Sequence, residues 1–117
     1  MAEGESVQFR LVRFAITVLN LCDRLPSRIE YYNLSTQLVR SASSAAASYA
    51  DANGAEGRHG FINGLATVLT ELKESEAWLE ILNQRGALPG EELLAVQEEC
   101  RALCRIIASQ RNAGCEA

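Results

Sequence analysis

The segment EGRH contains a residue spacing that metal-dependent helical enzymes use. Glu56 and His59 stand three positions apart, as in the Glu-x-x-His motif with which di-iron bundles bind metal. Such a site needs two of these motifs and two further glutamates, yet His59 is the only histidine in the chain. The motif also falls in the glycine-rich segment NGAEGRHG, which predicts a turn. We therefore interpret it as part of a solvated loop and predict no metal site.

Cysteines are the second candidate for metal chemistry. Cys100 and Cys104 lie one helical turn apart, with Cys22 as a distant third thiol. Cysteine is commonly buried as a small apolar residue, and no local ligand set completes a site, so we expect core packing and reduced thiols. No nucleophile can be matched to a base, and the glycines do not have phosphate-loop spacing. The sequence thus predicts a noncatalytic protein without a cofactor.

Helices must position any functional residues, because apolar residues recur at helical spacing along the chain. The pattern predicts helices at about 7–25, 34–53, 60–85 and 90–112. Pro26 should end the first, Asn33 or Ser35 should cap the second, and Gly86 should end the third. The short connectors predict an all-α fold, an antiparallel up-down-up-down four-helix bundle that forms one domain over residues 1–117.

Each expected helix has one apolar stripe that should face the core. Val12, Ile16 and Leu19 are expected to widen the stripe of the first helix into a broader bundle face. In chain order, the four stripes are Val7, Leu11, Phe14, Val18, Leu21 and Leu25; Leu38, Ala42, Ala45, Tyr49 and Ala52; Phe61, Leu65, Val68, Leu72, Ser75, Leu79 and Leu82; and Leu93, Val96, Cys100, Leu103 and Ile107.

Charge and hydropathy limit the expected partners. The net charge is −4, and no apolar run is long enough for a membrane span, so a soluble, cytoplasmic protein without a membrane partner is expected. Net acidity disfavours nonspecific nucleic-acid binding. Arg10, Arg13, Arg24 and Arg28 nevertheless form a basic stripe that can align with phosphates or an acidic partner. Without interleaved aromatic residues, we favour an ordinary water-facing side.

The segment QLVRSASSAAASYADA, Gln37 to Ala52, is built mostly from small residues. Small residues let helix backbones approach closely, which suggests that this helix packs in its own bundle and also near a subunit interface. The alternative is that alanine simply favours helix on an exposed face. Arg40 near such a face needs a partner, and we hypothesise an ion pair with Glu71 or Glu74, within or between subunits. Independent solvated charges are the alternative.

This segment and the later GFINGLATVLTELKESEAWLEIL resemble the bacterial four-helix-bundle family encoded in 23S rRNA intervening sequences, the ribosomal S23-like proteins. The resemblance covers about residues 34–111. It implies a ring of five subunits and roles in assembly or register for several of the matching residues. The matching residues are Gln37, Arg40, Ser41, Ser44, Glu71, Glu74, Trp78 and Leu79, of which Arg40, Ser41, Ser44, Glu71, Glu74 and Trp78 are the candidates for those roles.

Most proteins of this family have no assigned biochemical activity. The family also includes the accessory variability determinant of diversity-generating retroelements, a basic protein that binds nucleic acid and a reverse transcriptase. This chain is acidic, and it has Ser48 and Asp51 where relatives often carry an Asn-x-x-Glu pair. The sequence therefore favours a self-assembling scaffold or interaction module, with an accessory nucleic-acid or ribonucleoprotein-binding protein as the alternative.

Overall fold

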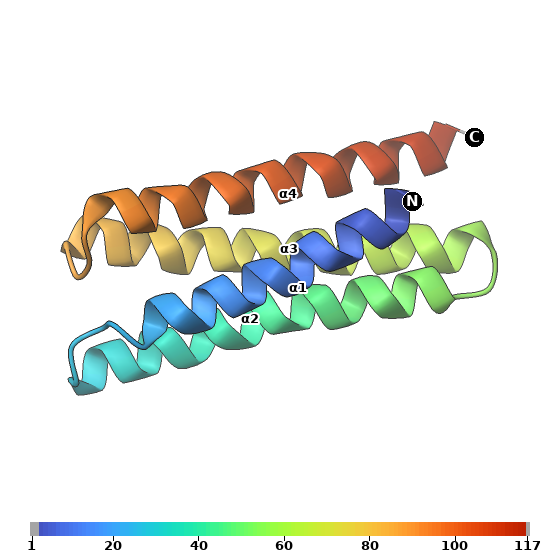
Figure 1. The fold of residues 1–117 in the computed structure, drawn as a ribbon. Coiled ribbons are helices and arrows are strands. Elements are labelled where there is room, and N and C mark those ends of the chain that lie inside the picture. The colour runs from blue at the N-terminus through green and yellow to red at the C-terminus, as the bar shows by residue number, and fades with distance from the viewer. Residues whose placement is uncertain (1–2, 117) are drawn as a thin grey trace.

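The computed structural model describes residues 3–116 as four helices. They are α1 (Glu3–Cys22), α2 (Ile29–Gly54), α3 (Gly57–Arg85) and α4 (Gly90–Glu116). Consecutive helices run in opposite directions (Figure 1), which confirms the all-α, up-down-up-down bundle. In the described part of the chain, no helix combines the length and apolar character that crossing a bilayer requires.

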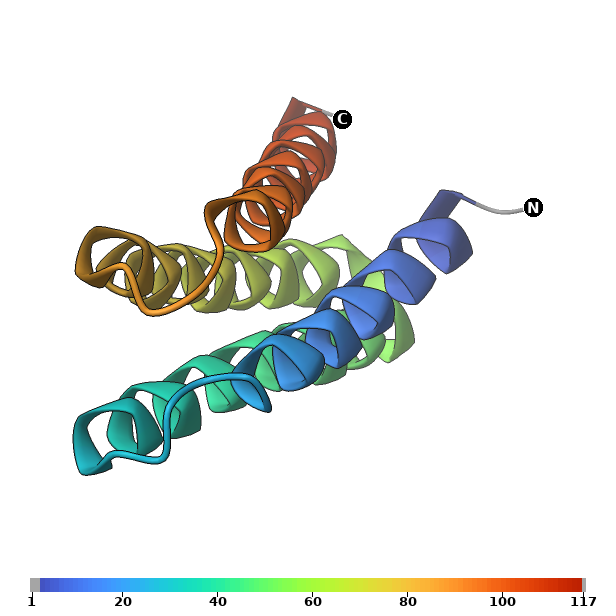
Figure 2. The ribbon, with the colours of Figure 1, turned by 60° about the vertical axis from the view of Figure 1, so that its left-hand side comes forward.

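The bundle is elongated and consists of two helical hairpins. Figure 2 shows α1 and α2 on one side, with α3 and α4 on the other. The most extensive packing is between α2 and α3, which joins the two hairpins, and the least extensive is between α1 and α4. Helices α1 and α3 do not contact each other, so they occupy diagonal corners of the bundle.

The core consists of the predicted inward stripes of all four helices. Leu11, Leu38, Leu72 and Leu103 are fully buried, one from each helix. All the other predicted core residues are buried too, except Leu25 and Phe61, which are partly buried and pack against the core. The helical period therefore predicts the core correctly, because each helix must remove one apolar side from water.

The α1–α2 connection differs from the prediction. Helix α1 ends at Cys22 rather than near Leu25, and α2 begins at Ile29 rather than at Asn33 or Ser35. Arg28 precedes α2 in extended conformation, without a side-chain cap. Tertiary packing explains the earlier start, because the first turn of α2 carries the buried Tyr31.

Tyr31 is surrounded by residues from the segment just before α2 and from the end of α3. The guanidinium carbons of Arg28 and Arg85 lie 5.8 and 5.6 Å from the centre of the Tyr31 ring. Glu30 accepts ion pairs from the same two arginines, at 2.7 and 3.4 Å. This cluster ties the start of α2 to the end of α3, so the helix extends a turn beyond its predicted cap.

A second correction concerns the outer side of α1. Val12, Ile16 and Leu19, which were expected to widen the buried face, are exposed by 43, 52 and 48%. Only α2 and, less extensively, α4 contact α1, so no neighbour within the chain covers this side. Helix α1 therefore has one buried and one exposed apolar side.

The α2–α3 connection is tighter than the predicted glycine-rich turn. Only Ala55 and Glu56 separate the two helices, and His59 lies in the first turn of α3. Near this end, a Cβ atom added to Gly64 would lie 2.5 Å from the Cβ of Ala52, so glycine is required for the close approach of α2 and α3. At the other end of α3, Gly86 adopts φ = +70° and ends the helix as predicted.

Candidate assembly surfaces and basic stripe

Two serines from different helices form a buried hydrogen-bonded pair between α2 and α3. The Oγ atoms of Ser41 and Ser75 are 2.7 Å apart, and both residues are almost fully buried. Each Oγ also lies near a carbonyl of its own helix, 3.1 Å from Leu38 O and from Glu71 O respectively. Two hydroxyl protons cannot supply all three bonds, so one serine donates to its own helix and the other donates across. This bond connects α2 with α3 inside one subunit, and the role of Ser41 in register stays a prediction.

The predicted ion pair of Arg40 does not form within the chain. Arg40 Nη2 instead donates to Gln37 Oε1 of the same helix, at 2.9 Å, and both side chains are exposed. Among the described residues, the ion pairs of the chain involve neither Glu71 nor Glu74. Solvent and Gln37 can satisfy the hydrogen bonding of an exposed guanidinium, so an ion pair of Arg40 with α3 would add little stability. A pair between subunits stays a prediction.

Glu71 and Trp78 leave polar atoms unsatisfied on α3. Glu71 Oε1 and Trp78 Nε1 are buried and have no hydrogen-bond partner in the part of the chain that is described. Both residues are half-buried, as is the predicted assembly residue Ser44 on α2. An unpaired buried polar atom costs about 1–3 kcal/mol, so this part of α3 is less well satisfied than the serine pair beside it.

The small residues of α2 lie on two different sides of the helix, one buried and one exposed. Ala42, Ala45 and Ala52 are buried and let α1 and α3 pack closely against α2. Ala47 and Ala50 are exposed. The close-packing interpretation therefore holds for the inner side, and the outer side is available to solvent or to another subunit.

The predicted basic stripe is largely neutralised by carboxylates of α4. Arg10 makes a two-pronged contact with Glu99, with Nη2 to Oε1 at 2.7 Å and Nε to Oε2 at 3.1 Å. This hydrogen bonding raises the pKa of the Arg10 guanidinium above its usual value. Arg24 pairs with Glu92 at 2.7 Å. The acidic residues of the second half of the chain thus meet the basic residues of the first.

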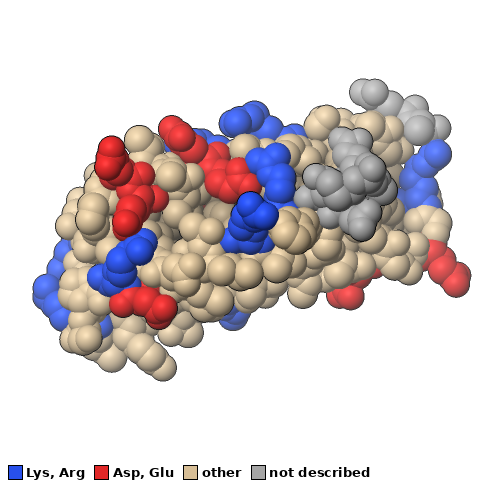
Figure 3. Space-filling view, in the orientation of Figure 1, with Lys and Arg blue, Asp and Glu red and all other residues tan. Residues whose placement is uncertain are grey.

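The other two arginines of the stripe are also engaged. Arg28 pairs with Glu30, as described above. The guanidinium carbon of Arg13 lies 4.9 Å from the centre of the Phe9 ring, a cation–π distance. Figure 3 shows the resulting mixture of basic and acidic side chains on this face, beside a broad area that is neither. A phosphate would have to displace carboxylates from three of the four predicted contact residues.

Three of the four cysteines, Cys22, Cys100 and Cys104, lie in the core or pack against it, whereas Cys115 is exposed. Cys100 is fully buried and donates its thiol hydrogen to Leu72 O at 3.3 Å, and Cys104 is buried beside it. The hydrogen bond with Cys104, together with burial, raises the pKa of Cys100. Burial also raises the pKa of Cys22, to about 11. Raised values disfavour the thiolate, which is the form that binds metal or reacts.

Glu56 and His59 are both exposed at the start of α3, although His59 lies on the helix and not in a loop. The described residues contain no group of three or more His, Cys, Asp or Glu side chains arranged to hold a metal ion.

Sequence reasoning missed an exposed apolar surface on α1, which we call the outer stripe. Phe9, Val12, Ile16 and Leu19 follow one another at steps of three, four and three, and they are 43–61% exposed. At 3.6 residues per turn, this spacing places them on the side of α1 opposite its buried residues. The signal was present in the sequence as a second helical periodicity.

A shallow hollow on α3 is the second surface that the sequence did not reveal, and we call it the α3 hollow. Its volume is about 500 Å³, and α3 alone lines it. Two of its lining residues, Thr70 and Ala77, have short side chains. The lining residues are Leu69, Thr70, Lys73, Glu74 and Ala77.

With the bundle and its surfaces described, comparison with known proteins is informative. The sequence matches the family of 23S rRNA-intervening sequence proteins over residues 6–109, nearly the whole length. The chain belongs to that family. The resemblance noted from the sequence is thereby confirmed.

A solved relative of the 23S rRNA-intervening sequence protein has the same fold. It is a crystal structure of a protein with unknown function from the S23 ribosomal protein family of Bacteroides thetaiotaomicron VPI-5482. The TM-score is 0.86 at 26% sequence identity, with 95% of this chain and 99% of that chain covered. Among curated proteins, no match was found.

Proposed function

We propose that this 23S rRNA-intervening sequence protein is a noncatalytic helical module that assembles with copies of itself in the cytoplasm. The observation that carries the proposal is the outer stripe on α1, where four large apolar side chains are exposed together. Contiguous exposed apolar residues on one helix are typical of surfaces that another protein covers. From the family resemblance, the expected assembly is a ring of five.

Nucleic acid is not part of the proposed function. Electrostatic neutralisation of phosphates needs available Lys or Arg side chains. Arg10, Arg24 and Arg28 are each paired with a glutamate, and the chain has a net charge of −4. These pairings support an interaction module for protein rather than for RNA or DNA.

The test is the absolute mass of the purified protein in solution, measured by light scattering at low and high salt, with and without a structured RNA. A stable oligomer at both salt concentrations, unchanged by RNA, is the expected result, because apolar contacts are not screened by salt. A monomer at every protein concentration would overturn the proposed function. A gain in mass with RNA at low salt would replace it with the accessory nucleic-acid-binding alternative.

A further inference from the structure

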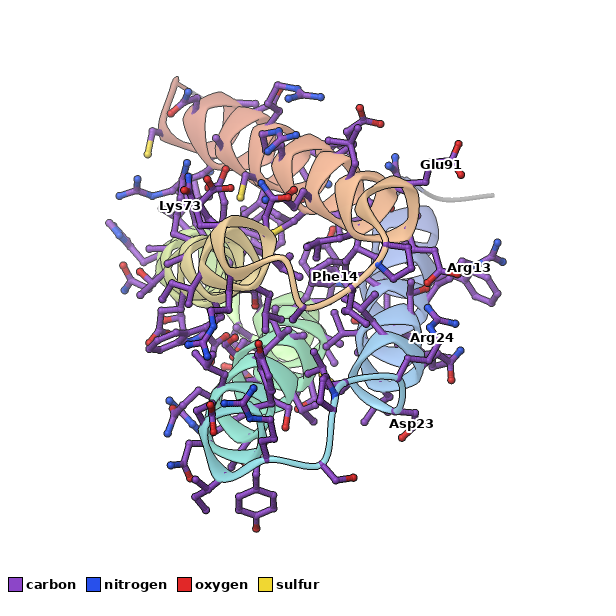
Figure 4. All side chains as sticks on the ribbon, turned by 90° about the vertical axis from the view of Figure 1, so that its left-hand side faces the viewer. Arg13, Phe14, Asp23, Arg24, Lys73 and Glu91 are labelled. Atoms are coloured by element: carbon purple, nitrogen blue, oxygen red, sulfur yellow. The ribbon has the colours of Figure 1, made fainter. Side chains whose placement is uncertain are left out.

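The two surfaces that the sequence did not predict lie on opposite sides of the bundle. The outer stripe belongs to α1 and the hollow to α3, and these two helices make no contact with each other. Figure 4 looks along the bundle and shows Arg13 of α1, with Arg24 just beyond the end of that helix, on one side, and Lys73 of the α3 hollow on the other. A single chain therefore cannot place its outer stripe in its own hollow.

The two surfaces match in shape and apolar character. The outer stripe is a ridge of branched and aromatic side chains, with Ile16 near its centre. The α3 hollow is lined in part by the short side chains of Thr70 and Ala77, so the larger side chains of another surface can enter it. Helices pack by placing the ridges of one surface into the grooves of another. Ile81, 45% exposed on α3 one turn beyond Ala77, extends the apolar surface past the hollow.

Charge adds a second match. Arg13 flanks the outer stripe and contacts the Phe9 ring, and it has no ion pair with any residue whose side chain is described. Glu74 flanks the hollow and has no ion pair among the described residues, because the neighbouring Lys73 pairs with Glu76 at 3.6 Å. The ridge thus has one uncompensated positive charge and the hollow one uncompensated negative charge.

We propose that the outer stripe of one copy docks in the α3 hollow of the next copy, with Arg13 facing Glu74. This inference rests on the proposed self-assembly and names the two surfaces through which it occurs. The contact joins unlike surfaces, so each added copy keeps one free ridge or hollow, and the copies form a ring if the rotation between them closes and an open filament if it does not.

The first experiment places a charge in the ridge. The variant Ile16→Glu should weaken association by about a hundredfold or more, because a buried unpaired carboxylate is strongly unfavourable. Leu94→Glu is the matched control, since Leu94 is 50% exposed on α4 and Ile16 is 52% exposed. Light scattering gives the mass, and circular dichroism verifies that both variants are folded. An oligomeric wild type whose Ile16→Glu variant keeps the same mass would overturn the docking surfaces while leaving self-assembly intact.

The second experiment tests whether the contact joins unlike surfaces. Ala77→Glu places a charged side chain in the hollow. This variant should be monomeric, as is expected of Ile16→Glu. Each variant keeps the surface that the other has lost, so mixing the two should produce a dimer with one copy of each. Two monomers after mixing, or an Ala77→Glu variant that assembles as the wild type does, would contradict docking of ridge in hollow and would favour contact between two α1 helices.

Charge reversal tests the proposed pair directly. Arg13→Glu and Glu74→Arg should each weaken association by about tenfold or more, because like charges then meet across the interface. The double variant restores opposite charges and should recover most of the wild-type affinity. If the double variant loses as much association free energy as the two single variants together, these residues do not face each other.

Discussion

At the scale of single residues, the buried polar groups of this bundle differ in how well they are satisfied. Ser41 and Ser75 complete each other's hydrogen bonding across α2 and α3. Glu71 Oε1 and Trp78 Nε1, also buried, have no partner among the described residues. Such a pair favours one register, because sliding one helix along the other by a turn breaks the bond between the two hydroxyls and leaves each with only the carbonyl of its own helix. The serine pair is therefore a specific determinant of how α2 packs on α3.

The serine pair predicts non-additive costs of substitution. Ser41→Ala and Ser75→Ala should each lower the free energy of unfolding by about 1 kcal/mol, through loss of the shared hydrogen bond. The double variant should cost less than the sum, since that bond is lost only once. Urea denaturation measures all three, and Ser43→Ala, on the exposed side of α2, is the control with little expected effect. Strictly additive costs would contradict the shared bond.

Cys22 predicts a loss of stability at high pH. Burial raises the pKa of its thiol from 9.0 to about 11, so the folded protein holds this proton longer than the unfolded chain does. The stabilising contribution is complete below pH 9.0, and the free energy of unfolding falls as the pH rises from there to about 11.

The matched variant for this pH dependence is Cys22→Ala. Urea denaturation across the same pH range should give a shallower decline than in the wild type, whatever the absolute stability of the variant. Equal slopes in the two proteins would show that Cys22 does not cause the decline.

At the scale of helices, the close approach of α2 and α3 depends on small residues at particular positions. Ala42, Ala45 and Ala52 are buried on α2, and Gly64 on α3 faces Ala52. These residues lie where the most extensive helix pair of the bundle packs. The hairpin of α1 and α2 is joined to that of α3 and α4 through this pair. The distance between α2 and α3 therefore determines how closely the two hairpins pack.

Substitution of Gly64 tests the spacing. The added methyl group of Gly64→Ala would lie 2.5 Å from Ala52 Cβ and 2.9 Å from Ala52 Cα, so the helices must separate. We expect a loss of about 1–3 kcal/mol in the free energy of unfolding, typical of overpacked cores. Gly54→Ala is the control, because a Cβ atom there has no neighbour within 4 Å and alanine favours helix. Equal stability of Gly64→Ala and the wild type would contradict the close approach.

At the scale of the whole molecule, charge is arranged so that opposite signs meet inside one chain. Residues 59–117 carry nine acidic and five basic residues, whereas residues 1–58 carry six of each. Two ion pairs with α4 use this asymmetry: Arg10 of α1 pairs with Glu99, and Arg24, just beyond the end of α1, pairs with Glu92. Such exposed pairs add little stability, but they remove positive charge from the surface.

RNA binding should therefore depend on the glutamates as well as on the arginines. We expect wild type to bind a structured RNA at low salt too weakly to change its mass in light scattering. The double variant Glu92→Gln, Glu99→Gln frees Arg10 and Arg24, and its affinity should be higher, with a salt dependence steeper by about 2 in slope. Fluorescence anisotropy over a salt titration measures both quantities. Tight binding by wild type that is lost in Arg10→Ala would contradict the neutralised stripe.

The sequence alone was sufficient for the number of helices, the four buried stripes and the stop at Gly86. Each of these depends on local rules, because every helix must bury one apolar side and glycine readily adopts the left-handed conformation that ends a helix. The family could also be identified from short segments of α2 and α3.

Only the tertiary structure decided that the second apolar side of α1 is exposed, where α2 begins, and which charges are paired. The exposed side of α1 depends on how few helices contact α1, and the start of α2 depends on the packing of Tyr31 between Arg28 and Arg85. The pairing of Arg10 joins residues 89 positions apart in the chain. Local periodicity carries no information on such distant partners, because it records what each helix buries and not which side chains the fold brings together.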